Sequence, residues 1–225
     1  MSLFEVNQAI ERPDAALVDA LSQIAVANIS DAMANLNTMD SGIQALSGSC
    51  ICGPACTAVT TTGDFLPVLK ALHAAQRDDV LVIDNQGTPD TALWGEITST
   101  EAQLKGLAGI VLDGLVRDIA EIREMGFPVF ARGTTPRVAE RGSLGEVNVS
   151  VRCGGTVIHP GDIIVGDTDG VAVVPKRKAE AVLARAQSIV EHEEVLRSRV
   201  AGGVSQVEIY NLDEQFESLR QTHEE

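Results

Sequence analysis

Residues 94–121, WGEITSTEAQLKGLAGIVLDGLVRDIAE, constrain the fold more than any other part of the chain. They predict a helix that begins at Gly95, an apolar strand at 110–112, a turn at Gly114, and a second helix that begins with Arg117 and Asp118. Ligands of α/β sheets bind beyond the carboxyl ends of the strands. We therefore expect Arg117 and Asp118 at a ligand site, with the unpaired amides of the Gly95 helix facing the same ligand.

The same alternation of helix and strand occurs three times. A continuous apolar run at 80–83 predicts a strand buried on both faces, and residues 127–131 predict another strand, which follows a helix ending near Gly126. Strands that alternate with helices in this way are typical of a parallel sheet with covering helices. The expected fold class is therefore α/β.

Upstream of this region, the chain predicts helices and strands with local signals at their ends. Residues 13–27 have apolar residues at helical spacing, and Ser30 or Asp31 has the chemistry to cap a second helix. Residues 48–62 predict strands separated by a turn at Gly53 and Pro54, followed by a helix that Asp64 caps. The loop from 86 to 90 then leads to the Gly95 helix.

Beyond Gly133 the pattern changes to short strands and ends in one long helix. The turn signals there are Gly154-Gly155 and 160–162, and residues 176–199 predict the helix. At 225 residues, the chain is predicted to form a single domain. Residues 1–28 would be its N-terminal helix and 176–225 its C-terminal helix and tail.

The net charge of −15 argues against nucleic acid or an anionic membrane surface as a partner. An anionic substrate would need a local cation, and Arg117 is the candidate. No run of 18 uncharged apolar residues and no signal-peptide pattern occurs, so we expect a cytoplasmic protein. The four cysteines have no convincing metal-ligand spacing and are interpreted as buried reduced thiols.

Each candidate site residue also has a purely structural interpretation. Glu121 follows Arg117 by four positions and Asp118 by three, so it can reach back to either, but such groups are also common surface ion pairs at helix starts. Asp84 and Asp113, at strand ends, would either orient metal-bound water or cap the turns that follow. Trp94 would either line the pocket or simply pack, and packing is the safer interpretation.

Four motifs taken together resemble the RraA-like family, which includes 4-hydroxy-4-methyl-2-oxoglutarate/4-carboxy-4-hydroxy-2-oxoadipate aldolases and the regulator of RNase E activity. The motifs are ISDAM at 29–33, GEIT at 95–98, GLAGIVLDGLVRDIAE at 106–121 and PGDIIVGDTDGVAVVP at 160–175. The resemblance implies a swivelling β/β/α domain that assembles as trimers or hexamers, with sites at subunit interfaces.

Carried over residue by residue, the resemblance implies a substrate-binding helix start at Gly95, Glu96, Ile97 and Thr98. It implies that Arg117 binds the substrate and that Asp118 ligates a divalent cation, Mg²⁺ or Mn²⁺. Glu121 matches the acidic position that accompanies the aldolases. A carboxylate from a neighbouring subunit is also implied, and three residues are candidates for it: Glu191, Glu193 and Glu194.

The activity implied is metal-dependent cleavage of a 4-hydroxy-2-oxo acid to pyruvate, with oxaloacetate decarboxylation as a side activity. A Lewis-acidic metal needs no Schiff-base lysine. The main alternative is a non-catalytic relative that binds a ribonuclease. A phosphate-carrying swivelling domain would need a histidine beside Gly114, and the sequence has none there. No glycine-rich cofactor pattern supports a methyltransferase.

Overall fold

Parallel strands form the centre of the sheet in the computed structural model, which describes residues 6–7, 9–60, 63–86 and 90–224. Neighbouring strands pair in the order β6, β5, β3, β2, and the short β4 also pairs with β5 in parallel. Their bounds are Ile51–Val59 for β2, Val80–Asp84 for β3, Ala92–Trp94 for β4, Gly109–Val116 for β5 and Val129–Thr134 for β6. The expectation of parallel strands with covering helices is confirmed.

Antiparallel strands extend this sheet at its edges. One pairs with β6, two follow β2 in the order β10, β11, and β7 pairs with the end of β2. A separate hairpin, β8–β9, turns at Gly154 and Gly155 as the sequence predicted. The bounds are Gln44–Ser47 for β1, Glu146–Val147 for β7, Val151–Cys153 for β8, Thr156–Ile158 for β9, Ile163–Asp167 for β10 and Gly170–Val174 for β11.

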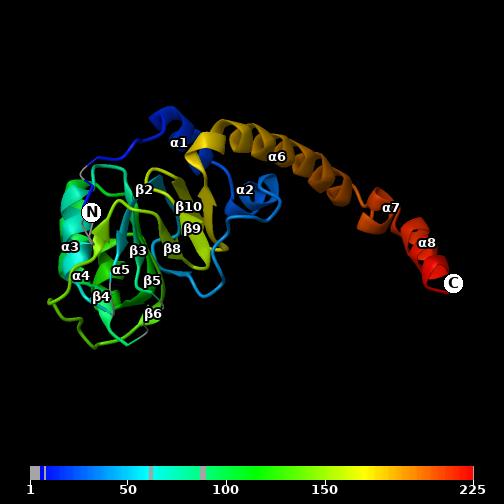
Figure 1. Ribbon diagram of the computed structural model, residues 1–225. Coiled ribbons are helices and arrows are strands. Elements are labelled where there is room, and N and C mark those ends of the chain that lie inside the picture. The colour runs from blue at the N-terminus through cyan, green and yellow to red at the C-terminus, as the bar shows by residue number, and fades with distance from the viewer. Residues whose placement is uncertain (1–5, 8, 61–62, 87–89, 225) are drawn as a thin grey trace.

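Both faces of the central strands are buried, which explains their continuous apolar runs. Because side chains alternate along a strand, Leu81 and Ile83 face one core while Val80 and Val82 face another. The first core packs against α3 (Leu66–Ala74), α4 (Glu96–Lys105) and α5 (Ile119–Met125), which lie together on one side of the sheet in Figure 1. The second core packs against the β8–β9 hairpin.

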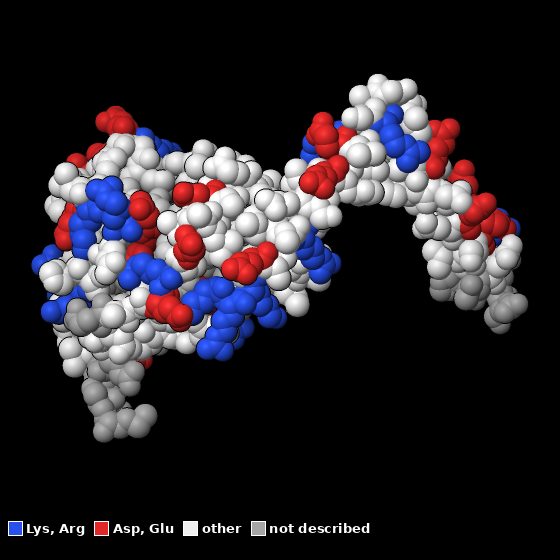
Figure 2. All heavy atoms as spheres, turned by 90° about the horizontal axis from the view of Figure 1, so that it is seen from above, with Lys and Arg blue, Asp and Glu red and all other residues white. Residues whose placement is uncertain are grey.

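A third core joins the N-terminal helices, α1 (Ala15–Ser22) and α2 (Val26–Ala32), to β10, β11 and the start of α6 (Ala179–Ala201). A short 3-10 turn at Lys176–Lys178 precedes α6. The rest of α6 continues into α7 (Gln206–Tyr210) and α8 (Leu212–Glu224), and this arm projects away from the sheet (Figure 1). Figure 2 shows acidic side chains along the arm.

Two predicted turns are wrong, because both lie inside strands. β2 runs straight through Gly53 and Pro54, since this half of the strand pairs with β10. A Cβ atom at Gly53 would lie 2.1 Å from the carbonyl oxygen of Asp78, so close backbone approach explains this glycine. Gly114 lies inside β5, next to an irregularity in its pairing with β6.

The predicted cap of the second helix is also wrong. Ser30 and Asp31 lie in the last turn of α2, and the helix begins at Val26. The amide of Val26 instead donates to the carboxylate of Asp167 in β10, 2.9 Å away. The cap is therefore supplied by a residue distant in sequence, which local patterns do not reveal.

Three further observations concern β4, the C-terminal helix and the apolar character of the helices. β4 was not predicted from the sequence and follows the expected loop at 86–90, of which residues 87–89 lie outside the described residues. The long C-terminal helix is confirmed. None of the helices in the described part of the chain is long and apolar enough to cross a membrane.

Candidate functional site

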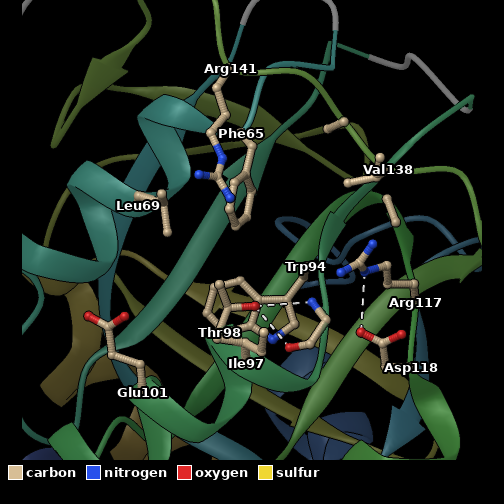
Figure 3. Close-up of a pocket in the computed structure, with 13 residues that line it drawn as sticks. Phe65, Leu69, Trp94, Ile97, Thr98, Glu101, Arg117, Asp118, Val138 and Arg141 are labelled. Carbon is tan, nitrogen blue, oxygen red and sulfur yellow. Dashed lines mark hydrogen bonds and ion pairs between the residues drawn. The ribbon is translucent and has the colours of Figure 1, made fainter.

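A cavity of about 200 Å³ opens where β4 and β5 end and α4 begins. One wall is formed by the start of α4 and by Arg117 and Asp118. The opposite wall is formed by Phe65 and Leu69, at the start of α3, and by the 138–141 segment (Figure 3). The cavity therefore lies beyond the carboxyl ends of parallel strands, where the sequence predicted a ligand site.

Arg117 and Asp118 occupy the junction between β5 and α5. The amide of Arg117 donates to the carbonyl of Trp94 at 2.9 Å, which continues the pairing of β5 with β4. Asp118 has a left-handed backbone, with φ of 55°, and forms the N-cap position of α5. Arg117 Nε lies 3.2 Å from Asp118 Oδ2, and both side chains remain about one-third exposed to solvent (39% and 34%).

The start of α4 contributes backbone donors to the same place. The amide of Glu96 donates to Asp118 Oδ2 at 3.2 Å, and the amide of Gly95 donates to Thr98 Oγ1 at 3.0 Å. The amides of Ile97 and Thr98 have no intrahelical acceptor because they lie in the first turn. The structure thus brings together Gly95, Glu96, Ile97, Thr98, Arg117 and Asp118. Glu96 contributes its amide rather than its exposed side chain, and Ile97 lines the cavity although it is largely exposed.

Gly95 and Trp94 have distinct structural roles beside the cavity. A Cβ atom at Gly95 would lie 2.6 Å from Asp118 Oδ2, so only glycine lets the helix start approach this carboxylate. Trp94 is 1% exposed, stacks on Phe127 with ring centroids 6.3 Å apart, and donates from Nε1 to Ser99 Oγ at 2.7 Å. Trp94 is packed, as expected, and also contributes to the cavity wall.

The remaining acidic candidates do not line this cavity. Glu121 is exposed, does not line the cavity, and forms no ion pair with Arg117 or Asp118 in the described part of the chain. Glu191, Glu193 and Glu194 lie on the projecting part of α6, where the last two pair with Arg197. Within one chain, therefore, none of the three reaches the site.

Asp84 and Asp113 support the β8–β9 hairpin. Asp84 Oδ2 accepts from the amide of Arg152 at 3.0 Å, and Asp113 Oδ2 accepts from the amide of Gly154 at 2.8 Å. Arg132 pairs with Asp113 and, at 2.9 Å, with Asp40. The hydrogen bond from Arg132 holds the pKa of Asp40 below its usual value. Asp84 and Asp113 therefore hold the backbone of the β8–β9 hairpin and do not form a second ligand site.

Sequence reasoning missed the opposite wall of the cavity. Phe65, Val138 and Arg141 form this wall, and Glu101 of α4 also lines the cavity. The guanidinium carbon of Arg141 lies 5.5 Å from the centroid of the Phe65 ring, within the range of a cation–π contact. Arg141 lies 24 residues beyond Arg117 in an irregular segment, so no local periodicity indicates that both face one cavity.

Comparison with known proteins identifies the family. The RraA-like family model, described as Aldolase/RraA, matches residues 26–173, which is more than half of the chain. The chain belongs to the RraA-like family. A Halalkalibacterium halodurans protein named "Putative 4-hydroxy-4-methyl-2-oxoglutarate aldolase" is 39% identical over 183 residues, 81% of this chain and 87% of that protein.

Solved structures of RraA-like fold agree with this assignment. Streptomyces coelicolor RraAS2, described as an unusual member of the RNase ES inhibitor RraA protein family, has a TM-score of 0.75 and 33% identity. The match covers 84% of this chain and 99% of that one. An uncharacterised protein from Pseudomonas syringae pv. tomato has a TM-score of 0.78 and 28% identity, covering 87% and 97%. The expected RraA-like fold is confirmed.

The donor set at Asp118 fits a hydrated divalent cation. One carboxylate oxygen contacts Arg117 and the Glu96 amide, and the side chain is partly open to the cavity. No cluster of three or more His, Cys, Asp or Glu residues with metal-binding geometry occurs among the described residues. A single carboxylate suits Mg²⁺, which keeps several of its waters when bound to proteins.

Proposed function

We propose that this protein is a divalent-metal-dependent aldolase that cleaves a 4-hydroxy-2-oxo acid, such as 4-hydroxy-4-methyl-2-oxoglutarate, to pyruvate. The observation that supports this most strongly is the convergence of Arg117, Asp118 and the first-turn amides of α4 on one cavity. The relative named as an aldolase supports the same reaction class. Decarboxylation of oxaloacetate passes through the same pyruvate enolate and is proposed as a side activity.

The residues of this chain have separate tasks in the proposed reaction. The amides of Ile97 and Thr98 bind the carboxylate of the 2-oxo acid at the positive end of the α4 dipole. Arg117 donates to the 2-oxo oxygen, where negative charge develops as the bond between C3 and C4 breaks. Thr98 Oγ1, held by the Gly95 amide, fixes the shape of the helix start.

The proposed cleavage of the C3–C4 bond needs no further reactant. The C4 hydroxyl loses its proton, the C3–C4 bond breaks, and its electron pair enters the pyruvate enolate, which takes up a proton at C3. From 4-hydroxy-4-methyl-2-oxoglutarate the products are two molecules of pyruvate. A cation held by Asp118 would supply Lewis acidity toward the 2-oxo acid.

We also propose that the active form is a homo-oligomer, a trimer or hexamer, in which Glu191, Glu193 or Glu194 of a neighbouring copy reaches the cavity. The projection of α6 away from its own body supports this arrangement (Figure 1). Size-exclusion chromatography with light scattering measures the assembly. A monomer with full activity would contradict the proposal.

The aldolase proposal is tested by measuring pyruvate release from 4-hydroxy-4-methyl-2-oxoglutarate and from oxaloacetate. We expect turnover with Mg²⁺ or Mn²⁺, its loss with chelator, and a fall of at least about 100-fold in Asp118→Ala. Glu124→Ala, which removes an exposed carboxylate on the same helix, is the matched control and should retain activity. Calorimetric titration with Mn²⁺ provides a second readout and should show weakened binding only in Asp118→Ala.

A different result would favour the second candidate function. The structural similarity to a ribonuclease-inhibitor relative supports a non-catalytic, ribonuclease-binding role. Absence of metal-dependent turnover of both compounds, in a folded and metal-loaded protein, would contradict cleavage of these substrates and leave either a different 2-oxo acid or that binding role.

A further inference from the structure

Arg141 is a second cation at the cavity, opposite Arg117. Figure 3 shows its guanidinium extending over Phe65 on the wall across from the start of α4. This arrangement places one cationic group on each side of a space of about 200 Å³. The cavity thus offers two separate positions for anionic groups.

The backbone on both sides of Arg141 is firmly held. Glu140 accepts from the amide of Phe65 at 2.9 Å, and Asp64 Oδ2 accepts from the amides of Gly142 at 2.6 Å and Ser143 at 2.7 Å. Asp64 is 5% exposed. A buried carboxylate therefore fixes the backbone beside Arg141, and the contact with the Phe65 ring places the exposed guanidinium at the cavity wall.

Arg141 has no ion-pair partner among the described residues, in contrast to other well-placed arginines. Arg12 pairs with Asp79, and Arg132 pairs with both Asp40 and Asp113. Glu101 also lines the cavity but forms no ion pair with Arg141. In a chain with a net charge of −15, a cation positioned at a cavity without a carboxylate partner is available for an anionic ligand.

Apolar side chains also line the cavity between the two arginines. Leu69, Trp94 and Val138 line the cavity together with the Phe65 ring. A short carbon chain can lie against these side chains with its 2-oxo acid end at Arg117 and the start of α4 and its other end near Arg141. A ligand with a second anionic group at that other end would use both cations, whereas a ligand with a single carboxylate would use only the first.

We infer that Arg141 forms a subsite for the distal carboxylate of the substrate and makes the site selective for 2-oxo dicarboxylates over 2-oxo monocarboxylates. This inference rests on the proposed function, which places the 2-oxo acid end of the ligand at Arg117 and α4. A guanidinium binds a carboxylate through two parallel hydrogen bonds, which provides both affinity and orientation.

The test uses two non-cleavable ligands of equal chain length, 2-oxoglutarate and 2-oxopentanoate, which differ only in the distal carboxylate. Calorimetric titration of the Mg²⁺-loaded full chain measures both affinities, and pyruvate serves as the reference ligand. We expect the wild type to bind 2-oxoglutarate at least about tenfold more tightly than 2-oxopentanoate, as for a charge-assisted hydrogen bond.

Three variants assign this preference to Arg141. Arg141→Met keeps a long side chain over Phe65 without the charge, so the preference should fall to within about twofold while pyruvate affinity stays unchanged. Arg141→Lys keeps the charge and should retain part of the preference. Arg137→Met, in the same segment but exposed and away from the cavity lining, is the matched control and should behave as wild type.

The outcomes separate this inference from the proposed function. Wild-type binding of pyruvate without a preference between the two C5 acids would overturn the Arg141 subsite and leave the proposed function standing. A preference that persists in Arg141→Met would also overturn it. Failure of the wild type to bind pyruvate or either C5 acid would contradict the proposed function, and the subsite inference with it.

Discussion

At the scale of single residues, the site depends on the space left by a missing side chain at Gly95. The backbone there is extended, with φ of −160°, so any residue could adopt it. The constraint is distance, because a Cβ atom would lie 2.6 Å from Asp118 Oδ2 and 3.1 Å from Arg117 Cγ. Gly95 therefore sets how closely the α4 amides, Arg117 and Asp118 converge.

Gly95→Ala should displace Asp118 and Arg117 while the fold remains intact. We expect a fall of about 10- to 100-fold in kcat/KM for pyruvate release, because small displacements of catalytic groups have large effects on rate. Steady-state kinetics and a thermal melt measure the two effects. Gly133→Ala is the control, since its Cβ would make only an ordinary 3.5 Å contact with Leu115. Equal activity of both variants would contradict this view of Gly95.

At the scale of structural elements, Asp64 joins α3 to the segment that forms the far wall of the cavity. Its Oδ1 accepts from the amide of Leu66, the first residue of α3, at 2.8 Å, although Phe65 rather than the predicted Asp64 occupies the N-cap position. Its Oδ2 accepts from Gly142 and Ser143, 78 and 79 residues away. Burial alone would raise the pKa of Asp64, but the amide hydrogen bonds from Gly142, Leu66 and Ser143 outweigh it and lower the pKa.

Asp64→Asn should lower the free energy of unfolding at pH 7 by about 1.5–3 kcal/mol, the value of hydrogen bonds to a charged group. Because the folded-state pKa is below the unfolded value of about 3.9, ionised Asp64 stabilises the protein above that pH. This stability is lost as the pH falls through the folded-state pKa.

Urea unfolding at pH 7, 5 and 3 checks this prediction. The difference between wild type and Asp64→Asn should be constant from pH 7 to 5 and narrow below pH 4. Asp169→Asn, an exposed carboxylate, is the control and should change stability little at any of these pH values. A difference that does not depend on pH would contradict a role for the ionised carboxylate.

At the scale of the whole molecule, three cores stabilise the body, which is the sheet with the helices packed against it. The arm formed by the rest of α6, α7 and α8 contributes few buried residues to these cores. The buried residues of α6 are Ala179, Val182 and Ala186, all in its first third, and α7 has none. Apolar side chains on the arm remain exposed, among them Phe216 at 76% and Leu219 at 62%. The body should therefore fold without the arm's distal part.

Deletion of residues 202–225 should change the melting temperature of the body by less than about 2 °C, because it removes almost no buried surface. Differential scanning calorimetry measures the change. Leu21→Ala is the contrasting variant, since Leu21 is fully buried, and it should cost about 2–5 kcal/mol. A large fall in melting temperature on deletion would show that α7 and α8 pack against a surface not present within one chain.

Elements whose signals are local could be predicted from the sequence alone. Continuous apolar runs predicted β3 and the centre of β5 as buried parallel strands, and Gly95 marked the start of α4. Position after a buried strand also predicted that Arg117 and Asp118 would lie together at a ligand site. The family resemblance added the reaction that these residues are proposed to perform.

Features that depend on contacts between distant segments could be seen only in the folded chain. β10 draws Gly53 and Pro54 into a strand, Asp167 caps α2 from 141 residues away, and Asp64 holds Arg141 opposite Arg117. In each case the interacting residue is far away in the sequence, so the local sequence pattern does not predict the contact. The second cation of the cavity therefore became visible only once the chain was folded.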